Sequence, residues 1–168
     1  MKPSGNRRVV VTGIGVVAPG GVTTKDFWSL LTDGRTATRP ISLFDASTFR
    51  SRVAAECDFD PVAAGLSAQE IRRSDRYVQF ALAAAAEAVV DSGLEFDEEL
   101  QDRAGVVLGS AVGGTTALED EFVVLSDTGK NWLVNAEYAG PFLYQALIPS
   151  SLAAGVAVKY GLHGPAQV

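Results

Sequence analysis

The feature that most constrains the fold is a run of apolar and β-branched residues near the start of the chain. Residues 9–17 read Val-Val-Val-Thr-Gly-Ile-Gly-Val-Val. The run has no polar face, so it indicates a central strand covered on both sides. Residues 104–111, Ala-Gly-Val-Val-Leu-Gly-Ser-Ala, have the same character. Two such strands separated by helical segments predict an α/β protein with a layered sheet.

Four segments carry helical signals. The longest helix is expected over residues 75–92, where apolar side chains recur at helical spacing, four alanines permit close packing and Gly93 ends the element. A shorter helix over residues 25–32 begins after Thr23 or Thr24 and ends at Asp33-Gly34. The remaining two helices are expected over residues 117–126 and 149–160.

The segments between the helices are expected to be mostly irregular. Residues 35–66 lack long periodicity, and we expect a loop-rich excursion there with a short strand near residues 52–57. Residues 95–103 indicate an acidic surface link. After the last helix a turn leads into what reads as the opening of a buried strand at Ala166. We therefore expect residues 1–168 to be the incomplete front part of a larger catalytic unit that does not fold alone as a stable monomer.

Composition excludes several classes of function. The formal net charge of −6 argues against a nucleic-acid binder, which would carry a basic face. No apolar stretch approaches the roughly 20 residues that span a bilayer. Cys57 is the single cysteine, so no intrachain disulfide can form, and a cytoplasmic location fits.

The glycines of the first strand allow a dinucleotide-binding interpretation. Residues 13–18 fit the dinucleotide-binding fingerprint G-x-G-x-x-A. Asp33 lies near the position of the acidic residue that follows this fingerprint by about 20 residues. That fingerprint requires a helix to begin at its second glycine, whereas Pro19-Gly20-Gly21 would break such a helix in its first turn. The alternative is that the glycines let another element pack closely on the strand.

No residue of this chain qualifies as a catalytic group. Cys57 lies between Glu56 and Asp58, whose charges would raise the thiol pKa and make it a poor nucleophile. His163 is the only histidine and reads as a turn residue. The histidine and cysteine count excludes a clustered metal site, and we expect no cofactor. The glycine-rich turn at residues 109–114 could line a pocket, present amides to an anion or serve only as a structural strand-to-helix turn.

Several strings, in order along the whole chain, resemble β-ketoacyl-ACP synthases. They are residues 8–21, 26–31, 44–45, 75–81 and 107–110, and the stretch 149–165 that ends in Gly164-Pro165. Residues 34–39, 51–56 and 125–129 are most similar to the ketosynthase alpha subunit of type II aromatic polyketide synthases, as found in actinomycetes.

The resemblance implies a thiolase-like, layered α-β-α-β-α fold, with this chain forming most of the first βαβαβ half. In the family a nucleophilic cysteine follows soon after Gly-Pro, so it is expected just after Val168, with the catalytic histidines and lysine beyond it. The implied reaction elongates a polyketide chain held on an acyl carrier protein by decarboxylative Claisen condensation with malonyl-ACP. The implied partners are the acyl carrier protein and, as a heterodimer, the ketosynthase beta (chain-length factor) subunit.

The resemblance also suggests where the chain could meet substrate and carrier. Ser110, Ala111 and Val112 would lie at a strand end that lines the acyl channel. Leu147 and Ile148 would reach across the dimer interface to the partner's channel. Arginines on the otherwise acidic surface would dock the acidic carrier protein; the candidates are Arg72, Arg73 and Arg76.

Three other interpretations remain open. A non-catalytic subunit of the chain-length-factor kind would have the same fold without the cysteine. A fatty-acid elongating ketosynthase would not need a non-identical partner subunit. A nucleotide-binding module would have to bind NAD(P) measurably.

Overall fold

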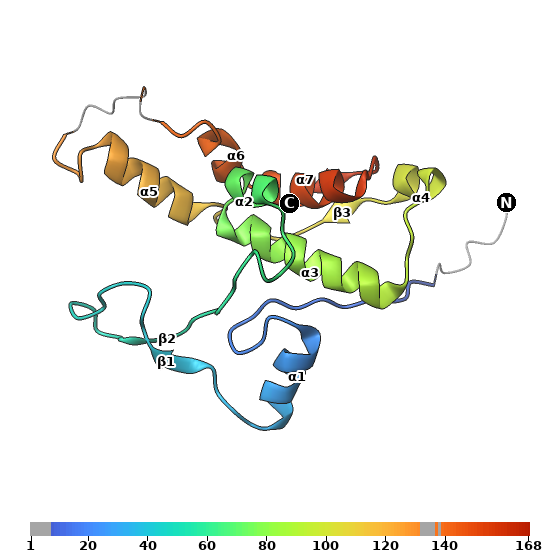
Figure 1. Cartoon of the computed structure of the whole chain (residues 1–168), viewed down its shortest axis with the longest axis horizontal. Helices are drawn as coiled ribbons and strands as arrows, with labels where there is room; N and C mark the ends of the chain where they lie inside the picture. The colour runs from blue at the N-terminus through green and yellow to red at the C-terminus, as the bar shows by residue number, and fades with distance from the viewer. Residues whose placement is uncertain (1–7, 132–136, 138) are drawn as a thin grey trace, which may run out of the picture.

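The computed structural model describes residues 8–131, 137 and 139–168. In chain order its elements are α1 (Thr24–Thr32), β1 (Thr38–Pro40), β2 (Val53–Ala55), α2 (Ala68–Arg73), α3 (Arg76–Ser92), α4 (Glu98–Arg103), β3 (Val106–Val107), α5 (Thr115–Leu125), α6 (Leu143–Leu147), α7 (Ser151–Tyr160) and β4 (Ala166–Gln167). Helix α3 runs through the middle of the molecule, with α7 and β3 on one side and the segment of residues 8–17 on the other (Figure 1).

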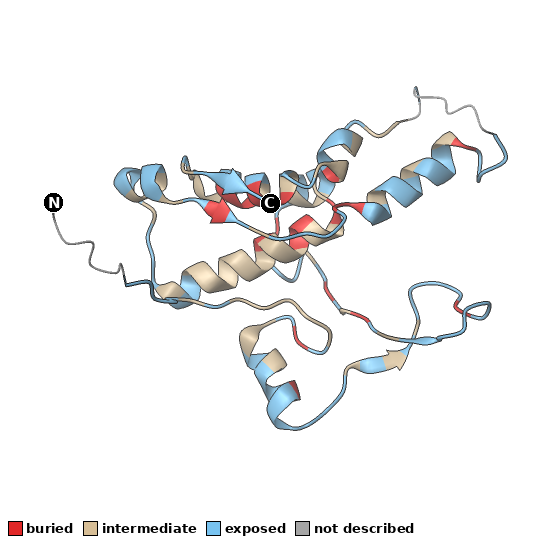
Figure 2. Ribbon diagram, turned by 180° about the vertical axis from the view of Figure 1, so that it is seen from behind, coloured by how far each residue is buried: buried red, intermediate tan, exposed pale blue. Residues whose placement is uncertain are grey.

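The hydrophobic core lies where α3 packs against α7. Val78 and Leu82 of α3 are buried against Leu152, Ala153 and Val156 of α7. Buried residues gather in this region, whereas the lobe of α1, β1 and β2 is mostly exposed (Figure 2). Burial of each large aliphatic side chain contributes about 1.5–3 kcal/mol, so the packing of α3 on α7 stabilises the fold.

Strands β3 and β4 form a parallel pair beside α7. Val106 pairs with Ala166 and Val107 with Gln167. Parallel strands need a long crossover, which residues between the two strands supply through α5, α6 and α7. The expected strand opening at Ala166 is confirmed as a strand, and the expected strand at residues 104–111 is confirmed only at Val106–Val107. The burial predicted for both strands is found only at Val106, since Val107, Ala166 and Gln167 are exposed.

The expected strand over residues 9–17 is wrong for this structure. The described residues provide no strand that pairs with it, and only an isolated bridge joins Ala18 to Gly21. A run that is apolar on both faces becomes a strand only when a neighbouring backbone satisfies its hydrogen bonds. Here the segment instead lies extended along α3, and Val9 remains 91% exposed.

Side chains of α3 supply hydrogen bonds that a neighbouring strand would otherwise make. The amide of Ile14 donates to Asp91 Oδ2 at 2.9 Å, and the amide of Val16 donates to Glu87 Oε2 at 2.8 Å. The second Glu87 oxygen accepts from the amide of Thr24 at 2.8 Å, at the start of α1. Glu87 therefore fixes both the extended segment and the first helix to α3.

The four expected helices are confirmed within two residues at each boundary. Thr23 caps α1, and Gly93 ends α3 in the left-handed region at φ 66°. Three short helices, α2, α4 and α6, were not expected, and α4 occupies most of the acidic link at residues 95–103, which is mostly exposed as expected. Ser67 and Glu70 form a capping box at the start of α2, a signal that the sequence already carried.

The excursion contains an antiparallel pair, with Thr38 of β1 opposite Ala55 of β2. The short strand expected near residues 52–57 is thus confirmed, and its partner β1 was not expected. Its loop is held by Glu56, which is only 7% exposed and accepts hydrogen bonds from the Ser42 amide and hydroxyl and the Leu43 amide. No helix in the part of the chain that the structure describes is long and apolar enough to cross a membrane.

Candidate functional site

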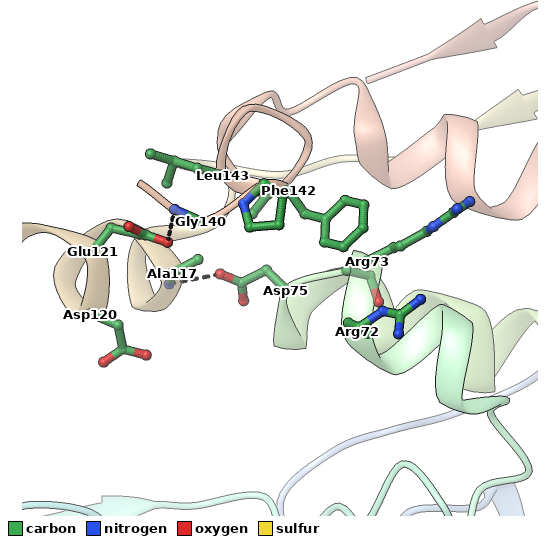
Figure 3. A pocket seen from close by; sticks show the side chains of 12 residues that line it. Arg72, Arg73, Asp75, Ala117, Asp120, Glu121, Gly140, Phe142 and Leu143 are labelled. Atoms are coloured by element: carbon green, nitrogen blue, oxygen red, sulfur yellow. Dashed lines mark hydrogen bonds between the residues drawn. The ribbon is translucent and has the colours of Figure 1, made fainter. Parts of the chain in front are cut away.

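The start of α3 meets the start of α5 and the end of α6, and this junction organises the candidate site. Asp75 directly precedes α3 and is only 9% exposed. Its Oδ2 accepts a hydrogen bond from the Ala117 amide at 2.9 Å, in the first turn of α5 (Figure 3). Gly114 caps α5 without a side chain, so the carboxylate of Asp75 supplies the missing capping acceptor from another element.

Glycine is required at this junction. A Cβ at position 114 would overlap the carbonyl oxygen of Ala146 and lie 2.8 Å from Asp75 Oδ2. The backbones at the start of α5 and in α6 therefore approach more closely than any side chain allows, and the Asp75 carboxylate lies beside this contact.

The five residues expected to line an acyl channel lie on two neighbouring segments. Ser110, Ala111 and Val112 are exposed in the turn between β3 and α5, and Leu147 and Ile148 are half-buried at the end of α6. Gly113 joins the two segments, since a Cβ there would lie 3.2 Å from the carbonyl oxygen of Leu147. The two groups thus come together, although they are far apart in the sequence.

Each segment is held by a specific hydrogen bond. The Ser110 hydroxyl oxygen accepts from the Gly113 amide at 3.1 Å and closes the turn. The Tyr77 hydroxyl, on α3, donates to the carbonyl oxygen of Ile148 at 3.2 Å. Burial raises the pKa of Tyr77, so the hydroxyl stays protonated as a donor.

A cavity of about 460 Å³ opens beside this junction, between the end of α2, α5 and the segment before α6. The guanidinium carbons of Arg72 and Arg73 lie 6.0 and 5.6 Å from the centre of the Phe142 ring (Figure 3). Asp120 and Glu121 of α5 line the cavity as well, and Glu121 Oε1 accepts from the Gly140 amide at 2.9 Å. The cavity therefore presents exposed cations near an aromatic ring and carboxylates from α5.

Arg76 does not share the surface of Arg72 and Arg73. Its guanidinium carbon lies 5.0 Å from the centre of the Phe80 ring, and its Nη2 donates to the carbonyl oxygen of Cys57 at 2.9 Å. These contacts hold residues 35–66 against α3. Of the three arginines proposed from the sequence for carrier docking, Arg72 and Arg73 are therefore exposed, whereas Arg76 is packed.

Cys57 and His163 lie outside the junction. Burial is the main cause that raises the pKa of the Cys57 thiol, Asp58 adds to it, and Arg76 opposes it. His163 follows the end of α7, with its Nδ1 2.7 Å from Asp102 Oδ1 at the exposed end of α4. No group of three potential metal-ligating His, Cys, Asp or Glu side chains occurs among the described residues.

The backbone around Gly13 and Gly15 does not have the geometry of a dinucleotide-binding loop. The described backbone forms no helix at Gly15, and α1 begins only at Thr24. A Cβ at Gly13 would overlap the carbonyl oxygen of Ala88, and one at Gly15 would overlap that of Ala84. The close-packing interpretation is therefore confirmed, with the alanines of α3 as the facing surface.

Comparisons with known proteins show the family to which the chain belongs. The family model described as the beta-ketoacyl synthase N-terminal domain matches residues 6–168. The putative polyketide beta-ketoacyl synthase 1 of Streptomyces cyaneus is 58% identical over 161 residues, which cover 96% of this chain and 38% of that protein. The granaticin polyketide putative beta-ketoacyl synthase 1 of Streptomyces violaceoruber is 55% identical over 159 residues, covering 95% of this chain and 38% of that protein.

A solved structure of a type II polyketide acyl-carrier protein in complex with its ketosynthase bound to the hexaketide superposes with a TM-score of 0.79. The two chains are 28% identical, and the match covers 96% of this chain and 37% of the ketosynthase chain in that structure. The expected thiolase-like α/β fold class is thereby confirmed, as is the similarity to type II polyketide ketosynthase alpha subunits. The chain spans about 38% of the length of the curated relatives named above. It belongs to the beta-ketoacyl synthase family, whose N-terminal domain it matches over nearly all of its residues.

Proposed function

We propose that this chain forms the N-terminal part of a type II polyketide ketosynthase alpha subunit. The complete enzyme elongates an acyl chain on an acyl carrier protein by decarboxylative Claisen condensation with malonyl-ACP. The observation that carries the proposal is the 58% identity to a putative polyketide beta-ketoacyl synthase over nearly the whole chain.

The nucleophile of this reaction lies outside the described elements. We place it just after Val168, beyond β4, which pairs with β3. Its thiolate attacks the thioester carbonyl of the acyl carrier, and the carrier thiol leaves. Malonyl-ACP then loses CO₂, and the resulting carbanion attacks the enzyme-bound thioester, forming a carbon–carbon bond and releasing the cysteine. The chain has grown by two carbons.

Within this proposal, Ser110, Ala111 and Val112 line the acyl channel. Leu147 and Ile148 reach the channel of the partner subunit. The closeness of Gly113 to the Leu147 carbonyl supports one continuous wall, because it joins the two segments.

The partners in this proposal are the acyl carrier protein and a chain-length factor subunit, which forms the heterodimer. Arg72 and Arg73 dock the acidic carrier, since both are exposed as adjacent cations on a chain of net charge −6. The proposed location is the cytoplasm.

The test is reconstitution of the complete gene product with its partner subunit, carrier protein and malonyl-carrier protein. Mass spectrometry of the carrier should detect chains that lengthen by two carbons, with release of CO₂. Absence of elongation by a correctly assembled complex would contradict the proposal.

Two alternatives give different results in the same assay. A chain-length-factor-like subunit would assemble with a ketosynthase but show no thiol that can be acylated just after Val168. A fatty-acid elongating ketosynthase would be active without a non-identical subunit. The names of the curated relatives, which are polyketide beta-ketoacyl synthases, favour the proposed enzyme over both.

A further inference from the structure

We propose that Asp75 and Tyr77 are positioning residues that set the spacing between the two walls of the acyl channel. The inference rests on the proposed function, because it takes residues 110–112 and 147–148 as those walls. Neither side chain touches the reacting atoms in this assignment. Both act through backbone groups of other elements.

The two side chains reach different walls from one helix turn. Asp75 Oδ2 accepts from the Ala117 amide at 2.9 Å, in the helix that directly follows the turn of residues 110–113. The Tyr77 hydroxyl donates to the Ile148 carbonyl at 3.2 Å, at the end of the opposite wall. The start of α3 therefore contacts both walls.

The start of α3 is itself fixed in place. Gln79 is buried, and its Nε2 donates to the carbonyl oxygen of Ser74 at 2.9 Å and to that of Ile71 at 3.2 Å. These bonds hold the backbone that precedes Asp75. The packing of α3 against α7 holds the rest of the helix, so the two positioning groups start from a rigid base.

The walls also meet without side chains between them. Gly113 and Gly114 allow the turn before α5 to approach the carbonyl oxygens of Leu147 and Ala146. Such a contact has no side chain to maintain its spacing, so the hydrogen bonds from α3 must maintain it. Figure 3 shows the Asp75 carboxylate directed at Ala117 in this junction.

Loosening the walls should affect long acyl chains more than short ones. A longer chain contacts more of the wall, so it loses more binding energy when the wall must be ordered during binding. A defect that merely reduces the amount of folded enzyme would lower the rates for all chain lengths by the same factor.

The experiment uses the complete ketosynthase with its partner subunit and measures kcat/KM for butyryl- and octanoyl-carrier protein, together with the melting temperature. The variants are Asp75→Ala, Asp75→Asn and Tyr77→Phe. The matched controls are Asp97→Ala, which removes a carboxylate that caps α4 by accepting from the Leu100 amide at 2.8 Å, and Tyr144→Phe, at an exposed tyrosine of α6.

Asp75→Ala should lower the octanoyl-to-butyryl ratio of kcat/KM about tenfold, and Tyr77→Phe about fivefold, as expected for losing one buried hydrogen bond. Asp75→Asn should stay within about twofold of wild type, because the amide oxygen still accepts from Ala117. The controls should leave the ratio unchanged even where they lower the melting temperature.

Equal losses for both substrates in Asp75→Ala and Tyr77→Phe would overturn the inference. If Asp75→Ala does not fold, Tyr77→Phe decides the question by the same ratio. A wild-type enzyme that condenses neither substrate would contradict the proposed function itself, which separates that failure from a failure of the positioning role.

Discussion

At the scale of single residues, glycine decides how the first segment lies against α3. Gly13 and Gly15 contact the helix backbone at positions where a Cβ would overlap the carbonyl oxygens of Ala88 and Ala84. The sequence allowed two interpretations of these glycines, a phosphate loop and a close approach. The proline and glycines that follow already argued for the second, because they prevent the helix that the first requires.

Replacing Gly15 with alanine should destabilise the complete protein by about 1–3 kcal/mol, because the new methyl group forces the segment away from α3. The matched control is Gly109→Ala, since a Cβ at Gly109 meets no atom within 4 Å. Chemical denaturation monitored by circular dichroism measures both. Equal midpoints for the two variants would show that the close approach is not required.

A second residue-scale prediction concerns Glu56 and pH. Hydrogen bonds from Ser42, then Leu43, and from Arg39 lower the pKa of Glu56 from 4.5 to about 2. A carboxylate whose folded-state pKa is lowered stabilises the fold above its unfolded pKa, and this stabilisation is lost as the pH falls toward the folded value.

Glu56→Gln should therefore lower the melting temperature at neutral pH, and the difference from wild type should shrink as the pH falls from about 4.5 toward about 2. Thermal melts across that range measure it. Asp97→Asn is a suitable comparison at an exposed helix cap. A difference that stays constant with pH would contradict the role of the Glu56 charge.

The residue scale also shows where charge counting along the sequence succeeds and fails. The prediction that the Cys57 pKa is raised is confirmed, but burial is the main cause and Glu56 is not among the causes. Glu56 is turned toward Ser42 and Arg39 instead. Neighbours in the sequence need not be neighbours in space.

At the scale of elements, long helices could be predicted from their periodicity, whereas of the short ones only α2 carried a signal, its capping box. Helix α3 has enough residues to show an apolar stripe, and Gly93 marks its end. Helices α4 and α6 are too short to show periodicity, and tertiary contacts stabilise them. For example, the Gln101 side chain of α4 donates to the carbonyl oxygen of Tyr160 at 3.1 Å.

Strands follow a different rule, because they depend on a partner. Residues 9–17 have stronger strand propensity than residues 166–167, yet only the latter pair in this structure, since β3 lies beside them. Propensity along one segment cannot supply the backbone groups of another. The candidate channel was predictable only through family resemblance, and the roles of Asp75 and Tyr77 required the three-dimensional contacts.

The next prediction concerns docking of the carrier protein at the last turn of α2. Arg72→Glu with Arg73→Glu should weaken binding of the carrier protein to the complete ketosynthase by about tenfold or more at low salt, because attraction becomes repulsion. Arg50→Glu is the matched control, at an exposed arginine of the excursion. Titration calorimetry at two salt concentrations measures the effect. Equal affinity in both variants would remove α2 from the docking surface.

At the scale of the whole molecule, the chain has one packed core, and many of its large apolar side chains outside that core are exposed. Val9 and Val11 are 91% and 82% exposed, and Val107 of β3 is 77% exposed. Large exposed apolar side chains in such numbers indicate interaction surfaces. The chain also spans about 38% of the length of its curated relatives. In the proposed ketosynthase, we expect these surfaces to be buried.

The most direct test of the central claim is a chimaera. Residues 6–168 of this chain replace the matching segment in the putative polyketide beta-ketoacyl synthase 1 of Streptomyces cyaneus, and the unmodified relative serves as control. Carrier-bound products are measured by mass spectrometry in the presence of the partner subunit and malonyl-carrier protein. The account predicts two-carbon elongation by the chimaera. A folded chimaera that accepts an acyl chain but forms no carbon–carbon bond, while the control does, would contradict it.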